Sequence, residues 1–100
     1  MNRVFVLKNC LQAATALRQT LSPAGIRRAY RVVGDLHAQT IEEAGSNAAV
    51  LAVLTTASDE EKAQAASELG WTPNPQNVQL LLQIAEQMMV MMAASKGVPA

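Results

Sequence analysis

Residues 22–45 read SPAGIRRAYRVVGDLHAQTIEEAG, and both ends of this stretch carry helix-boundary signals. Ser22 can cap a helix, and Pro23 suits the first helical position because an N–H there has no partner in the helix. Gly45 provides the stop. Between these ends, apolar residues recur at three- and four-residue steps, at Ile26, Ala29, Tyr30, Val33, Leu36, Ile41 and Ala44. This spacing predicts a long helix with one face on a hydrophobic core.

Two details of this helix carry further expectations. Gly34 lies in its middle, where glycine costs about 1 kcal/mol relative to alanine. We therefore expect either a kink at Gly34 or the close approach of another backbone. Arg31 and Asp35 are four residues apart, so they are expected to form an ion pair on the helix surface.

Downstream of this helix, the sequence predicts three more. Ser46 or Asn47 can cap a short helix over residues 48–57. Ser58 and Glu61 have the spacing of a capping box, which predicts a fourth helix that ends near Gly70. Prolines then interrupt residues 71–75, and a fifth helix is expected over residues 76–95, with Gly97 as its stop.

Upstream, apolar residues recur at helical spacing over residues 4–21, which favours a first helix. Residues 4–7, VFVL, are equally suited to a strand. No second β-rich run is present to pair with them, so a helix is favoured unless two chains pair their N-termini.

These elements predict an all-α fold, a compact bundle of about five helices in a single domain over residues 1–100. The C-terminal helix is apolar around most of its circumference, so we expect it to lie at the centre of the bundle or at a homodimer interface. Its strict spacing of three and four residues predicts a helix–helix seam. The seam, and the expected oligomer interface, consists of Val78, Leu81, Ala85, Met88 and Met92.

Composition limits the setting in which the chain works. Cys10 is the single cysteine, which excludes an internal disulfide and a site built from several thiolates and favours a cytoplasmic location. No apolar run reaches the roughly 20 residues of a membrane span, so no membrane association is expected. Residues 1–34 are basic and free of acids, as mitochondrial targeting segments are, and that alternative stays open.

Catalytic chemistry has little support in the sequence. His37 is the only histidine and lies on the apolar stripe of the second helix, where a structural role is the better interpretation than a nucleophilic pair with Cys10. The glycines are scattered and form no phosphate-binding loop. No ligand spacing typical of a metal site is present. We therefore expect a protein that is not an enzyme and has no metal or cofactor.

Charge is the most informative functional signal. The first six charges along the chain are positive, and of the ten that follow, from Asp35 onward, eight are negative. Arg27 and Arg28 have no acid three or four residues away, so at least one of them must project outward. With Arg31 and Trp71, they are the expected contact residues for an acidic protein partner. The predicted function is a homodimeric adaptor, chaperone or inhibitor, as among phage- or plasmid-type accessory proteins.

A nucleic-acid-binding regulator is the alternative from a different class. Residues 59–82 superficially resemble a helix-turn-helix, with Ala66 four residues before the turn residue Gly70. The prolines lengthen the turn, and no basic residue lies between Lys62 and Lys96 to hold phosphates. The basic residues 18–31, with Tyr30 for base stacking, are the other surface that could bind DNA or RNA.

Overall fold

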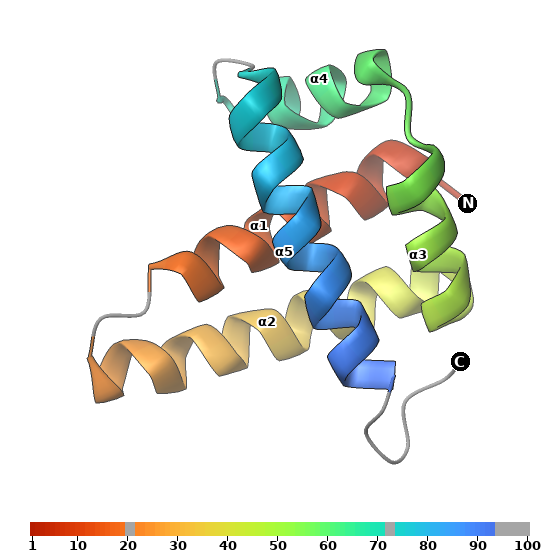
Figure 1. Cartoon of the computed structure of the whole chain (residues 1–100). Coiled ribbons are helices and arrows are strands. Elements are labelled where there is room, and N and C mark those ends of the chain that lie inside the picture. Colours follow the sequence, from red (N-terminus) through yellow and green to blue (C-terminus); the bar gives the residue numbers. More distant parts are fainter. Residues whose placement is uncertain (20–21, 72–73, 94–100) are drawn as a thin grey trace.

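The computed structural model describes residues 1–19, 22–71 and 74–93, with the side chains of residues 92 and 93 excluded. Five helices account for most of this part of the chain, and it contains no strand. They are α1 (Arg3–Arg18), α2 (Pro23–Ala44), α3 (Asn47–Thr56), α4 (Asp59–Glu68) and α5 (Pro75–Ala93), shown in Figure 1. The predicted all-α fold with five helices is confirmed.

Side-chain caps set the helix starts as the sequence predicts. Ser22 Oγ accepts a hydrogen bond from Gly25 N at 3.1 Å. Ser46, not Asn47, caps α3. Both bonds of the predicted capping box are present, from Ser58 N to Glu61 Oε1 at 2.9 Å and from Glu61 N to Ser58 Oγ at 3.1 Å. These bonds satisfy N–H groups that the first helical turn leaves without partners.

Residues 4–7 are part of α1, so they form the helix that the sequence favoured and not the alternative strand. Asn2 caps α1, since its Oδ1 accepts a hydrogen bond from Phe5 N at 3.0 Å. The apolar spacing over residues 4–21 does not indicate this cap, although asparagine is among the best N-cap residues. Because α1 starts at Arg3, its apolar face extends to the chain end and packs against α4 and α2.

The helices form a flat molecule of 33 × 30 × 17 Å. Figure 1 shows α1 and α2 side by side, α5 crossing in front of them, and α3 and α4 at the periphery. The central helix is α1, which contacts all four others, whereas α5 contacts α1, α3 and α4. Small buried residues such as Cys10, Ala13 and Ala14 let neighbouring helices approach α1 from several sides. The helix at the centre of the bundle is therefore α1, where the sequence favoured the C-terminal helix, α5.

The apolar seam of α5 packs inside the chain itself. Val78, Leu81, Ala85 and Met88 are all at most 7% exposed, so the seam is a contact within one chain. The side chain of Met92 lies outside the described residues. The helix is not buried all round, because Leu80, Val90 and Met91 are exposed on its other side. None of the described helices, α5 included, is long and apolar enough to cross a membrane.

Candidate interaction surface

Three of the six basic residues that precede Asp35 have polar partners within the fold. Arg3 Nε lies 2.8 Å from Glu61 Oε2, and Lys8 Nζ lies 3.4 Å from Glu68 Oε1, so α1 is tied to α4 by two ion pairs. Arg18 Nη1 donates a hydrogen bond to Asn77 Oδ1 at 3.1 Å. Hydrogen bonding to Arg3 is the main reason why the pKa of Glu61 falls to about 2.

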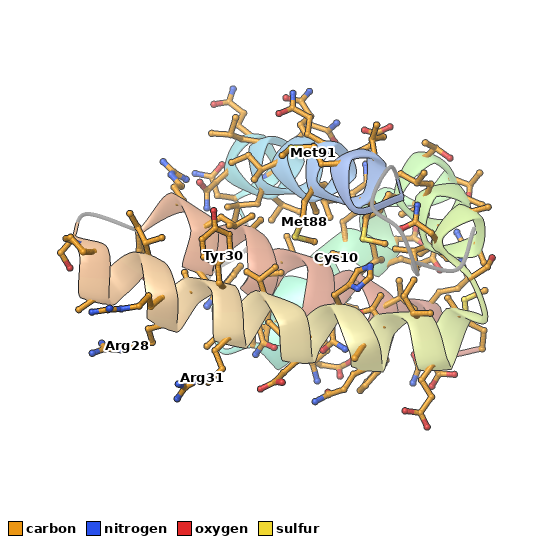
Figure 2. The ribbon with its side chains drawn as sticks, turned by 90° about the horizontal axis from the view of Figure 1, so that it is seen from below. Cys10, Arg28, Tyr30, Arg31, Met88 and Met91 are labelled. Carbon is orange, nitrogen blue, oxygen red and sulfur yellow. The ribbon has the colours of Figure 1, made fainter. Side chains whose placement is uncertain are left out.

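The other three basic residues that precede Asp35 have no polar partner among the described residues. Arg27, Arg28 and Arg31 are exposed on α2, and none of them makes an ion pair or a side-chain hydrogen bond with a residue that the structure describes. Figure 2 shows Arg28 and Arg31 pointing away from the body of the molecule. The expected pair between Arg31 and Asp35 is not formed, which corrects that prediction. We call Arg27, Arg28 and Arg31 the arginine surface.

Apolar residues next to the arginine surface are more exposed than the helical stripe predicts. Ile26 is 42% exposed and Tyr30 is 68% exposed. Only Ala29, Val33 and Thr40 of α2 are buried, because α2 contacts only α1 and α3 within the described part of the chain. In Figure 2, Tyr30 points to the opposite side of α2 from Arg28 and Arg31.

Trp71 lies in a different region. It follows a Schellman-type helix end, in which Gly70 has φ +80°, Gly70 N donates to Ser67 O at 2.9 Å and Trp71 N donates to Ala66 O at 3.0 Å. Its side chain is half-buried and packs against the hydrophobic core. This α4–α5 junction is at the opposite edge of the molecule from α2 (Figure 1), so Trp71 and the arginine surface do not form one site.

Cys10 and His37 are not arranged as reactive groups. Cys10 is buried, and burial raises the pKa of its thiol to about 12, so the sulfur stays protonated at neutral pH. Burial also lowers the pKa of His37, an effect that the Asn47 side chain opposes. His37 Nε2 and Asn47 Oδ1 are buried without a hydrogen-bond partner among the described residues, while Asn47 Nδ2 donates to Met89 O at 3.2 Å.

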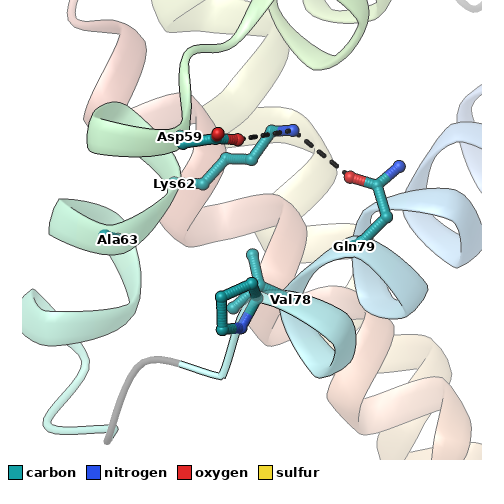
Figure 3. Close-up of a pocket in the computed structure, with 6 residues that line it drawn as sticks. Asp59, Lys62, Ala63, Val78 and Gln79 are labelled. Atoms are coloured by element: carbon teal, nitrogen blue, oxygen red, sulfur yellow. Dashed lines mark hydrogen bonds and ion pairs between the residues drawn. The ribbon is translucent and has the colours of Figure 1, made fainter.

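A cleft lies between α4 and α5 (Figure 3). It has a volume of about 170 Å³ and lies beside Lys62 and Gln79. Lys62 Nζ donates to Gln79 Oε1 at 3.2 Å and lies 4.0 Å from Asp59 Oδ1, so the polar groups at its rim already contact one another. Pockets for small molecules usually measure roughly 300–1,000 Å³, so this cleft is too small for most ligands.

Two polar residues that a recognition helix at the start of α5 would present, Asn77 and Gln79, already have hydrogen-bond partners in the fold. Asn77 and Gln79 lie at the start of α5, where a recognition helix would present them to bases. Both accept hydrogen bonds within the chain, Asn77 from Arg18 and Gln79 from Lys62. Their carbonyl oxygens are therefore occupied in the fold.

Comparison of the chain with protein-family models, with curated proteins and with solved structures finds no match.

Within the described residues, no group of three or more His, Cys, Asp or Glu side chains could hold a metal ion. The arginine surface is therefore the strongest candidate for a functional site, because it combines charge, exposure and the lack of partners within the described fold.

Proposed function

We propose that the chain is a small interaction protein without catalytic activity, which binds an acidic surface of another protein through Arg27, Arg28 and Arg31. One observation carries this proposal. Of the six basic residues that precede Asp35, Arg3, Lys8 and Arg18 make an ion pair or a side-chain hydrogen bond within the fold, and the three on α2 make neither with described residues. Arg3, Lys8 and Arg18 therefore connect elements of the fold. The arginine surface stays available to a partner.

The chemistry of arginine supports a contact role for this surface. A guanidinium group can form two parallel hydrogen bonds with one carboxylate, which adds direction to charge attraction. Arginine and tyrosine are enriched among the residues that dominate binding energy at protein interfaces. Ile26 and Tyr30 are also exposed on α2, but Tyr30 points to the opposite side of the helix from Arg28 and Arg31 and so lies outside the arginine surface.

Affinity capture tests this proposal. Extracts of the source cells are passed over the wild-type chain, over Arg27→Glu/Arg28→Glu/Arg31→Glu, and over the control Gln83→Glu/Gln87→Glu, which adds negative charge on an exposed part of α5. A partner should be retained by the wild type and by the control, lost from the triple variant, and bound more weakly as salt increases. Retention of the same partner by the triple variant would contradict the proposal.

A nucleic-acid-binding regulator is the second candidate, and the exposure of Tyr30 is the observation that favours it. An exposed aromatic ring can stack on an unpaired base, and Tyr30 lies on the same helix as the arginines. The zero net charge of the chain disfavours strong binding to phosphates. Fluorescence anisotropy with labelled single-stranded oligonucleotides separates the two functions, because Tyr30→Ala should weaken oligonucleotide binding.

Homodimer formation stays a prediction, but the seam of α5 is no longer the surface that would make it. Val78, Leu81, Ala85 and Met88 are covered by the chain's own helices and cannot contact a second chain without unfolding. A dimer of the folded chain must use an exposed face.

A further inference from the structure

The outward face of α2 carries charges that are complementary to the same face of a second copy. Arg27, Arg28 and Arg31 lie in its N-terminal half, Asp35 and Glu42 follow, and all five are exposed. With about 3.6 residues per turn, Arg27, Arg31, Asp35 and Glu42 project within roughly one quarter of the helix circumference. The face is therefore positive toward the start of α2 and negative toward its end.

This charge order does not stabilise α2 itself. The dipole of a helix favours acids near its N-terminus and bases near its C-terminus. In α2, the first turn has no acid and the last turn has no base, and the arginines lie toward the unfavourable end. Asp35 and Glu42, like the arginines, form no ion pair with any described residue. The part of the fold that the structure describes provides no ion-pair partner for these charges.

Along the axis of α2, Gly34 lies midway between the two charged ends, at one edge of the charged face. Arg27 precedes it by seven residues and Glu42 follows it by eight. It is exposed within a continuous helix, and a Cβ placed on it would meet no atom within 4 Å. The chain's own packing therefore does not require a glycine here, although glycine weakens the helix. A glycine at the crossing point of two helices lets their backbones approach closely.

We propose that the outward face of α2 is a homodimer interface, in which the α2 helices of two copies cross antiparallel at Gly34. Arg27 and Arg28 of each copy then lie opposite Glu42 of the other, and Arg31 lies within reach of the other copy's Asp35. A two-fold axis at the crossing makes every contact twice, as in most homodimers. The inference goes beyond the proposed function but uses the same arginines, so an acidic partner competes with the second copy for them.

The exposed side of α5 is a weaker candidate for self-association. Leu80, Val90 and Met91 are exposed there, but no charge complementarity indicates what would cover them. An interface through α5 is therefore retained as one outcome of the test.

Sedimentation velocity at about 100 μM, where micromolar self-association is visible, tests the inference. The wild type should be a dimer at low ionic strength and dissociate near 1 M salt, where the screening length falls to about 3 Å. Arg27→Glu/Arg28→Glu and Glu42→Arg should each be monomers, because like charges then face one another. An equimolar mixture of these two variants should restore a dimer, because each repulsive pair becomes attractive in the mixed species.

Two further variants make the result specific. Gly34→Gln places a bulky side chain at the crossing and should weaken self-association. Met91→Glu changes the exposed side of α5 and should leave the dimer intact. All variants should keep the helical circular dichroism of the wild type, because the substituted side chains are exposed.

Three results would overturn the inference: a monomeric wild type at this concentration, a mixture that stays monomeric, or a dimer lost in Met91→Glu and kept in the α2 variants. The last result assigns the interface to α5. The proposed function fails separately, because its test measures capture of a different protein and does not depend on a dimer.

Discussion

Replacement of Gly34 by alanine is expected to stabilise the folded chain, an unusual direction for a change within a helix that packs on a core. The position is exposed and helical, and a new Cβ meets no atom within 4 Å. The only large effect is then the lower conformational entropy of the unfolded chain, which is worth about 0.5–1 kcal/mol in a helix interior. In a domain of this size, 1 kcal/mol corresponds to a rise in Tm of roughly 4–8 °C.

Thermal unfolding followed by circular dichroism measures this effect, near 1 M salt so that the self-association proposed above is screened. Gly45→Ala in the same helix is the matched control. Gly45 ends α2 with φ +98°, where an L side chain is strained, so the same substitution should lower the Tm there. A lower Tm for Gly34→Ala would refute the reasoning, because it would mean that some part of the chain occupies the space beside Gly34.

The remaining predictions concern the hydrophobic core, the loss of stability at low pH, the thiol of Cys10 and the ring of Trp71. Leu11→Ala, at a fully buried position on α1, should cost about 2–5 kcal/mol of unfolding free energy in urea titrations, whereas Leu80→Ala, at an exposed position on α5, should change it by less than about 0.5 kcal/mol. A larger loss at Leu80 would place the centre of the core at α5. The pKa of Glu61 is lowered from 4.5 to about 2, so the stability that depends on its carboxylate should be complete above pH 4.5 and lost as the pH falls toward 2. Glu61→Gln should flatten this part of the stability curve, and an unchanged curve would show that the contact with Arg3 contributes nothing. Cys10 should react with a thiol reagent only when the chain unfolds, because it is 2% exposed, and fast reaction of the native chain would contradict its burial. Trp71→Ala should cost about 1–3 kcal/mol, less than for a fully buried ring, with melting temperature as the measure.

The arginine surface could be found from the sequence only in part. The sequence predicts that at least one of Arg27 and Arg28 projects outward, because no acid lies three or four residues away, and both are exposed. Arg31 was assigned a partner in Asp35 that the structure does not place within ion-pair distance. For Trp71, which follows the helix-ending Gly70 and precedes two prolines, the sequence predicts a ring that anchors the turn against the bundle, with an exposed binding residue as the alternative. Neither alternative specifies where Trp71 lies relative to α2.

The sequence by itself determined the helix content and most helix boundaries of this protein. Caps such as Ser22 and Ser58 act on residues within three or four positions along the chain, so their effect is local and readable from spacing. The tertiary structure alone decided that α1 is central and that the seam of α5 lies within one chain. It also decided which basic residues are neutralised, since the two ion pairs to α4 join residues 58 and 60 positions apart. Such contacts depend on how helices pack across the whole chain, and no short-range pattern specifies that packing.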